Sequence, residues 1–184
     1  MLAHESLARV VVVGTSCSGK STFARELARR LDSRYVELDE LYWAPEWTPK
    51  PETEFLRLTD AATTGPRWVV DGNYGAVREL VWPRATSIIW LNFSLPTVFG
   101  RALWRTVRRS LLREALFAGN RETFRRAFFS RDSILLWVLT SYGPRRHNYP
   151  SLRAEGRYPN PGWVELHRPA EASAFLHGVG GEGW

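Results

Sequence analysis

The sequence predicts an α/β fold in which a doubly wound parallel sheet is covered by helices on both faces. Short apolar runs typical of buried strands alternate with segments whose apolar residues recur at helical spacing. A glycine-rich turn joins the first of these strands to the first helix. The chain has 184 residues, 44 % of them apolar, which fits one domain over residues 1–184.

Five segments have the apolar and β-branched character of strands buried within a parallel sheet. They are residues 9–13, 34–38, 68–70, 86–91 and 163–166. The chain between the second and third strands is rich in proline, with one helical piece at 52–61, and we interpret it as an excursion that can move as a flap.

Helices are expected in the connections between the strands. Phe23, Leu27 and Leu31 recur every four residues and form one apolar stripe after the first strand. A second helix begins near Pro96, a third covers 134–139 and ends at Gly143-Pro144, and the last covers 169–176. We expect 145–160 to be a loop or a mobile segment.

The turn after the first strand carries the most specific signal. Residues 14–21, Gly-Thr-Ser-Cys-Ser-Gly-Lys-Ser, match the phosphate-binding pattern G-x-x-x-x-G-K-[ST] at every fixed position. Backbone N–H groups of such a loop cradle phosphates, Lys20 reaches the β- and γ-phosphates, and Ser21 ligates Mg²⁺. The predicted ATP-binding residues are Gly14, Thr15, Ser16, Cys17, Ser18, Gly19, Lys20, Ser21 and Thr22. The alternative is a glycine-rich turn with a solvated lysine.

Two acids follow the second and third strands, at the edge of the sheet where ligands gather. Asp71 is placed to orient Mg²⁺, and Ser21 and Asp71 are the predicted metal ligands. The alternative for Asp71 is a turn with Gly72. Asp39 can accept a proton or hydrogen bond from an acceptor hydroxyl, or it can simply cap a helix or turn.

Charge is unevenly spread along the chain, whose net charge is +6. Nine arginines and two acids lie between Arg101 and Arg131, which indicates an anionic partner, either nucleotide phosphates or nucleic acid. A solvated helix surface is the alternative.

Cysteine content and hydropathy indicate the cellular compartment in which the protein is found. One cysteine, Cys17, excludes an internal disulfide and a cysteine-rich metal site. No apolar stretch reaches the roughly 20 residues of a membrane span. We expect a soluble, cytoplasmic protein.

Four features together resemble the adenylate-kinase-like small P-loop kinases. They are the phosphate loop, residues 38–47 (Leu-Asp-Glu-Leu-Tyr-Trp-Ala-Pro-Glu-Trp), residues 70–74 (Val-Asp-Gly-Asn-Tyr) and an arginine-bearing helix after the fourth strand. More narrowly, the chain resembles bacterial ATPases known as DNA topology modulation proteins, over residues 10–176. The resemblance implies a five-stranded parallel sheet with the P-loop NTPase fold of nucleoside and nucleotide kinases. It also implies a flap at about 40–66 and an arginine-rich lid at about 109–130.

The resemblance also implies roles for single residues. Asp39 matches the acid on the acceptor side, Asp71 the acid that orients Mg²⁺, and Arg101 with Arg105 the arginines that contact ATP at the base of the lid. Arg168-Pro169 matches the loop that packs on adenine. Adenylate kinases have an arginine after the first of these acids that grips AMP, whereas this chain has Glu-Leu-Tyr-Trp at 40–43. Arg78 likewise lies a turn beyond the corresponding arginine after the third strand, so we expect an acceptor other than AMP.

The sequence therefore predicts an enzyme that moves the γ-phosphoryl group of ATP to a small acceptor with Mg²⁺. The predicted catalytic residues are Lys20, Asp39, Asp71, Arg101 and Arg105. Two alternatives stay open, an ATP-switched regulator that binds nucleic acid and a simple ATPase.

The predicted flap carries the aromatic residues Tyr42, Trp43 and Trp47. They either line an acceptor pocket or pack the flap against the core.

Overall fold

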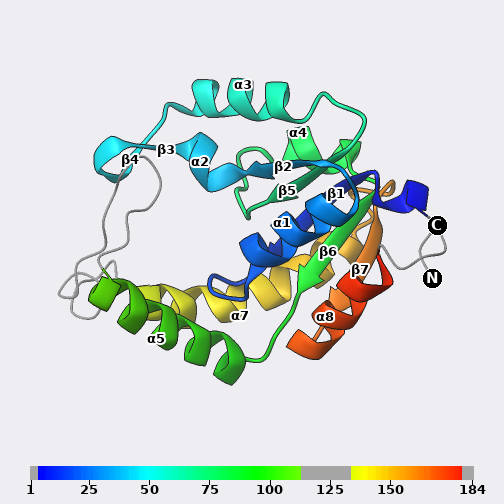
Figure 1. The fold of residues 1–184 in the computed structure, drawn as a ribbon. Coiled ribbons are helices and arrows are strands. Elements are labelled where there is room, and N and C mark those ends of the chain that lie inside the picture. Colours follow the sequence, from blue (N-terminus) through cyan, green and yellow to red (C-terminus); the bar gives the residue numbers. More distant parts are fainter. Residues whose placement is uncertain (1–3, 113–133, 180–184) are drawn as a thin grey trace.

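A computed structural model describes residues 4–112 and 134–179 of the chain (Figure 1). Its centre is a five-stranded sheet in the order β2-β5-β1-β6-β7, and all neighbouring strands are parallel. The strands are β1 (Arg9–Gly14), β2 (Arg34–Glu37), β5 (Trp68–Asp71), β6 (Ser87–Leu91) and β7 (Gly162–Leu166). The predicted fold class and all five predicted strands are confirmed, with ends shifted by one residue.

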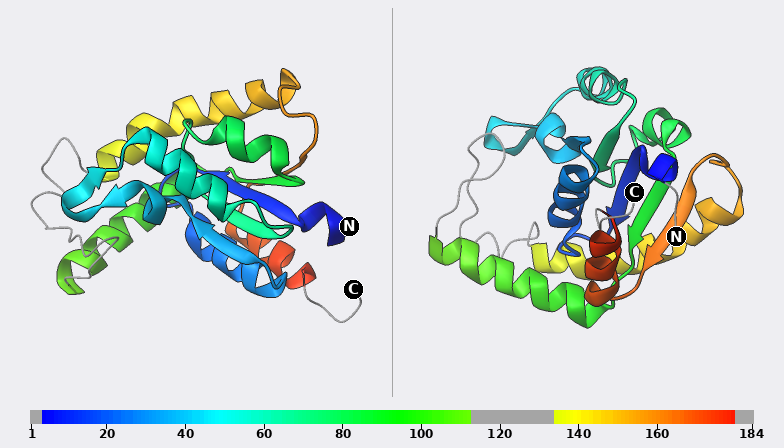
Figure 2. Two further views of the ribbon diagram at one scale, coloured as in Figure 1. Left: turned by 90° about the horizontal axis from the view of Figure 1, so that it is seen from above. Right: turned by 45° about the vertical axis from the view of Figure 1, so that its right-hand side comes forward.

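Helices cover both faces of the sheet because each central strand is apolar on both sides. Val10 and Val12 of β1 face one layer of helices, whereas Val11 and Val13 face the other. The first layer is α1 (Lys20–Arg30), α8 (Pro169–Gly178) and the start of α5 (Leu95–Leu112). The second is α3 (Glu52–Ala62), α4 (Arg78–Val81) and the end of α7 (Ile134–Ala154). Figure 2 shows α1 and α8 on one side of the sheet and α4 and α7 on the other.

The long connection between β2 and β5 contains more structure than the sequence indicated. It begins with α2 (Leu38–Tyr42) and a small antiparallel pair, β3 (Trp43–Ala44) and β4 (Thr48–Pro49), around the 3₁₀ turn η2 (Pro45–Trp47). Helix α3 follows, where the sequence predicted a helix at 52–61. This is the segment predicted as the flap, and we call residues 38–50 the flap hairpin. Two further 3₁₀ turns are η1 (His4–Leu7) and η3 (Trp82–Arg84).

The predicted end of the third helix at Gly143-Pro144, and the loop at 145–160, are wrong as far as Ala154. Helix α7 continues through Pro144 and Pro150. Each interior proline costs a helix about 3 kcal/mol. The continuation buries Tyr149 and Leu152 against the sheet, and this packing outweighs the local preference.

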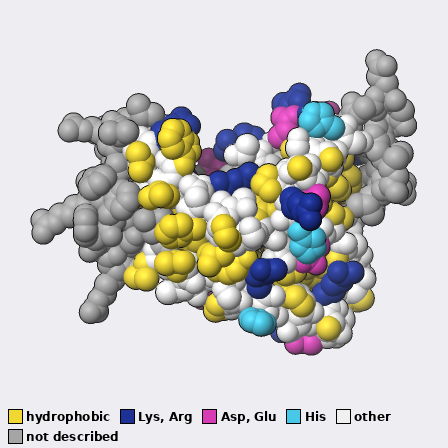
Figure 3. All heavy atoms as spheres, turned by 90° about the horizontal axis from the view of Figure 1, so that it is seen from below, with side chains coloured by type: hydrophobic (Ala, Val, Ile, Leu, Met, Phe, Trp, Pro, Cys, Tyr) yellow, Lys and Arg dark blue, Asp and Glu magenta, His cyan; other side chains and the backbone are white. Residues whose placement is uncertain are grey.

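Helix α5 contains the start of the predicted lid. Of the predicted lid at about 109–130, residues 109–112 are the last turn of α5, and the rest lies outside the described residues. Exposed large apolar side chains occur on α5 and α7, at Leu103, Trp104, Leu136 and Leu139. Seen from below, the molecule has apolar side chains gathered on one part of its surface (Figure 3). Within residues 4–112 and 134–179, no helix is both long and apolar enough to cross a membrane.

Candidate active site

The phosphate loop follows β1 at the carboxyl edge of the sheet and leads into α1. Cys17 and Gly19 have left-handed backbone, with φ of 65° and 91°, and the N–H of Ser18 donates to the carbonyl oxygen of Thr15 at 3.1 Å. Turns of this kind bring backbone N–H groups to a concave site for anions. Because α1 begins at Lys20 directly after Gly19, the positive end of the helix adds to this site.

Glycine is required at the first position of the loop for lack of space. Gly14 has φ of 155°, and a Cβ atom there would lie 2.8 Å from the carbonyl oxygen of Leu91. Any side chain would therefore push β1 away from β6, and the loop would lose its support.

The side chain of Asn73 holds the same glycine from the other side. Its Nδ2 donates to the carbonyl oxygen of Gly14 at 2.5 Å, and its Oδ1 accepts from the N–H of Gly14 at 3.2 Å. The hydroxyl of Tyr149 on α7 donates to the same Oδ1 at 3.0 Å. Asn73 thus links the loop to β5 and α7. Asn73 lies within the segment 70–74 that carries the family resemblance, but the sequence predicts no role for it.

Asp71 ends β5 behind the loop and is 3 % exposed. Burial raises the pKa of its carboxyl, while the charge of Lys20 and a hydrogen bond from Ser21 oppose the rise. Its Oδ1 is buried without a hydrogen-bond partner among the described residues. A carboxylate oxygen left unpaired beside a serine hydroxyl fits Mg²⁺, which is bound by few protein oxygens together with substrate phosphates. The described residues contain no cluster of three metal-binding side chains.

Asp39 lies in the first turn of α2, half-buried. Its Oδ1 accepts a hydrogen bond from the hydroxyl of Tyr74 at 2.5 Å. Burial and the negative charge of Asp39 raise the pKa of Tyr74, so the phenol stays protonated as a donor. The N-cap of α2 is Glu37, so Asp39 is not the helix cap that the sequence left open.

A third acid, Glu37, was not predicted from the sequence. It is 6 % exposed, stands beside Asp71 in the register of β2 and β5, and pairs with Nη2 of Arg25 on α1 at 3.2 Å. Burial raises the pKa of Glu37, and the charge of Arg25 opposes it. A search for alternating acids at the end of β2 could have found it, because Glu37 and Asp39 are two residues apart.

A cleft of about 1460 Å³ brings most predicted residues together. Those that line it are Ser16, Cys17, Ser18, Gly19, Lys20, Ser21, Thr22, Asp39, Arg101, Arg105 and Pro169. Gly14, Thr15 and Asp71 are not in its wall; Thr15 and Asp71 are buried. Arg168 is not in the wall either, because its side chain is 81 % exposed and lies 3.9 Å from Glu171.

Helix α5 reaches the phosphate loop through its arginines. Nη1 of Arg101 donates to the carbonyl oxygen of Ser18 at 2.6 Å. Nε of Arg105 is buried without a hydrogen-bond partner among the described residues. Both side chains line the cleft, so they can donate hydrogen bonds to phosphate oxygens with little rearrangement.

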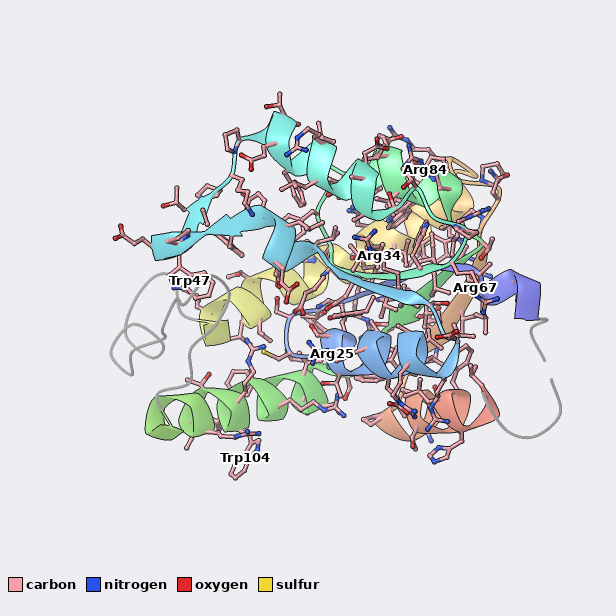
Figure 4. The ribbon with its side chains drawn as sticks, turned by 45° about the horizontal axis from the view of Figure 1, so that its top comes forward. Arg25, Arg34, Trp47, Arg67, Arg84 and Trp104 are labelled. Carbon is pink, nitrogen blue, oxygen red and sulfur yellow. The ribbon has the colours of Figure 1, made fainter. Side chains whose placement is uncertain are left out.

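The aromatic residues of the flap hairpin divide between the two roles considered for them. Trp43 and Trp47 line the cleft, with ring centres 5.6 Å apart and nearly perpendicular planes. Tyr42 instead packs with Phe55 and Tyr74, at 5.1 and 4.6 Å between ring centres. Figure 4 shows Trp47 on the side of the flap hairpin that faces α5, and Trp104 on the outer side of α5.

Solved structures show the same fold. The shikimate kinase from Acinetobacter baumannii, in complex with shikimate, aligns with a TM-score of 0.60 and 14 % identity over 95 % of this chain and 92 % of its own. The shikimate kinase from Bacteroides thetaiotaomicron aligns with a TM-score of 0.52 and 15 % identity over 94 % and 96 %. No protein-family model matches the chain. No curated protein sequence matches it significantly.

These likenesses show that the chain has the fold of small P-loop kinases. They do not support the narrower resemblance to adenylate-kinase-like or DNA topology modulation proteins, which stays a prediction.

Proposed function

We propose that this protein is an ATP-dependent kinase that transfers the γ-phosphoryl group to a hydroxyl of a small acceptor, with Mg²⁺. One observation carries the proposal: the phosphate loop and Asp39 line the same cleft, so a phosphoryl donor and an acceptor can meet there. The P-loop kinase fold supports it.

The phosphate side of the cleft supplies positive charge. Backbone N–H groups of the loop hold the β-phosphate, and Lys20 bridges the β- and γ-phosphates. Arg101 and Arg105 neutralise the charge that spreads over the transferred group. Ser21 and Asp71 would hold Mg²⁺, which when bound supplies further neutralisation of the phosphates.

The acceptor side supplies the base. Asp39 takes the proton of the acceptor hydroxyl while the oxygen of that hydroxyl forms a bond to the γ-phosphorus. The bond from that phosphorus to the bridging oxygen breaks, ADP leaves, and the product is a phosphate ester. Tyr74 keeps the Asp39 carboxylate in place through its hydrogen bond.

The nucleotide base is assigned to the apolar part of the cleft wall. Leu91, Phe93, Pro169 and Ala172 belong to this wall, and apolar side chains of this kind suit the faces of a purine. The resemblance implies that Arg168 and Pro169 pack on adenine, and of the two Pro169 lies in the wall of the cleft.

The regulator alternative depended on the arginine-rich stretch from Arg101 to Arg131. Its first two arginines, Arg101 and Arg105, line the cleft, which favours nucleotide phosphates as their partner. Nucleic-acid binding would fall steeply with salt, whereas kinase turnover would change little.

Two measurements test the proposal. Calorimetry of Lys20→Ala should show a large loss of ATP affinity, because a charge on the β- and γ-phosphates is removed. Arg57→Ala is the matched control, since Arg57 is an exposed cation on α3 outside the wall of the cleft, and its loss should leave ATP affinity unchanged. Release of ADP should rise with an acceptor from a broad panel of nucleosides, sugars and alcohols; a failure of every acceptor would overturn the kinase proposal.

A further inference from the structure

We infer that the acceptor is a hydroxylated ring that carries no acidic group, so that it is neutral or positively charged. The inference rests on the proposed function and names the substrate class for the acceptor side of the cleft. This side is defined here by the cleft residues Arg25, Glu37, Asp39, Glu40, Trp43, Trp47 and Lys50.

The first cation of the acceptor side, Arg25, forms an ion pair with an acid of the same side. Its guanidinium lies 3.2 Å from the carboxylate of Glu37 and 5.1 Å from the ring centre of Tyr35. Glu37 is 6 % exposed, so an acceptor carboxylate that drew Arg25 away would leave a buried acid without its partner. The side chain of Arg25 is itself 65 % exposed, so its charge is balanced by Glu37 and screened by water, and it attracts an entering acid only weakly.

The second cation, Lys50, is committed to the backbone. Its ammonium group donates to the carbonyl oxygens of Glu40, Leu41 and Trp43, at 3.3, 2.9 and 3.4 Å. An ammonium group has three donors, and all three are used at the carboxyl end of α2. Lys50 therefore holds the flap hairpin together and has no donor left for an acidic acceptor.

The remaining charges of the acceptor side are negative. Asp39 is half-buried and Glu40 is exposed. Together with Glu37, three acids face two engaged cations, so an acid that enters meets repulsion, while a neutral or cationic molecule does not. Hydroxyl and ammonium groups are hydrogen-bond donors, and they suit carboxylates that can only accept.

The apolar part of the acceptor side is aromatic. Trp43 and Trp47 are half-buried and their rings meet at 82°, which forms a corner of two indole surfaces. Such surfaces pack on the C–H face of a ring, and they attract an ammonium group through their π-electrons. The acceptor side thus combines carboxylate oxygens, which accept hydrogen bonds, with two indole surfaces. This combination fits a ring that bears hydroxyl groups.

The test compares acceptors that share a ring and differ in charge. ADP release from the full chain is measured with ATP, Mg²⁺ and either glucose, glucosamine or glucuronate, and likewise with shikimate methyl ester or shikimate. At least one neutral or cationic member should react with kcat/KM about tenfold or more above that of its acidic partner, because repulsion acts on the acid alone. Faster reaction of glucuronate or shikimate would overturn the inference.

A charge reversal makes the test independent of any one compound. The preference is the ratio of kcat/KM for the non-acidic member of a pair to kcat/KM for the acidic member. Glu40→Lys should lower this ratio several-fold. Glu52→Lys is the matched control, since Glu52 is exposed on α3 outside the wall of the cleft, and it should leave the preference as in the parent. An unchanged preference in Glu40→Lys would contradict the electrostatic argument.

Binding gives a readout apart from turnover. Binding of the non-acidic compounds should change the tryptophan fluorescence of the parent protein, and this change should be smaller in Trp47→Phe. If ATP binds but none of the five compounds raises ADP release or changes the fluorescence, the inference is overturned. The kinase proposal is then decided separately by the broad acceptor panel and by Lys20→Ala.

Discussion

The side chain of Asn73 offers a sharp test of how the phosphate loop is held. Asn73→Ala removes three hydrogen bonds, two to the backbone of Gly14 and one from the hydroxyl of Tyr149. Each hydrogen bond contributes a net 0.5–1.5 kcal/mol, so we expect the free energy of unfolding to fall by about 2–4 kcal/mol. Tyr149→Phe removes one bond of the three and should cost about 1 kcal/mol.

Urea unfolding of the ligand-free protein measures the effect. Asn160→Ala is the matched control, because Asn160 is exposed and makes one long hydrogen bond of 3.3 Å to the carbonyl oxygen of Pro83. It should change the free energy of unfolding by less than about 0.5 kcal/mol. An Asn73→Ala variant as stable as the Asn160→Ala variant would refute the role of Asn73 as the support of the loop.

Three other predictions concern Asp71, Gly72 and Arg105. Asp71→Asn should raise the free energy of unfolding in the absence of Mg²⁺, measured in urea at neutral pH, while phosphoryl transfer is lost. Burial raises the pKa of Asp71 above its ordinary 3.8, so at a pH between the unfolded and folded pKa values the folded protein binds a proton that the unfolded chain has lost. Stability should therefore fall as the pH rises from about 4 through the folded-state pKa, with a smaller slope in Asp71→Asn. Gly72→Ala should lower the melting temperature markedly, since Gly72 has φ of 148° and a Cβ atom would lie 2.8 Å from Leu38; an unchanged melting temperature would contradict the geometry. Arg105→Ala should slow phosphoryl transfer by roughly one to several orders of magnitude at unchanged melting temperature, and full activity of this variant would exclude a role in charge stabilisation.

The sequence predicted the parts of the fold that depend on local signals. The strands are visible because β1, β5 and β6 are buried on both faces and therefore consist of apolar runs. The phosphate loop is visible because its glycines and Lys20 have fixed spacing. Helix α7 was misjudged because Pro144 and Pro150 are local signals, whereas the burial of Tyr149 depends on residues far away in the chain, namely Asn73, Trp82 and Trp90.

The parts of the site that were missed depend on contacts between distant segments. Glu37 stands beside Asp71 only through the register of β2 and β5. Tyr74 meets Asp39 across 35 positions of the chain, and Arg25 of α1 meets Glu37 across 12. No periodicity or motif encodes these pairs, because they arise when the sheet forms.

The central claim is that the γ-phosphoryl group of ATP moves to an acceptor whose hydroxyl is held by Asp39. The most direct measurement is mass spectrometry of the acceptor after incubation with ATP, Mg²⁺ and either the parent protein or Asp39→Asn. We predict a phosphorylated acceptor with the parent and almost none with Asp39→Asn, while calorimetry shows equal ATP affinity for both. Free phosphate without any phosphorylated acceptor, or the same yield from both proteins, would contradict the account.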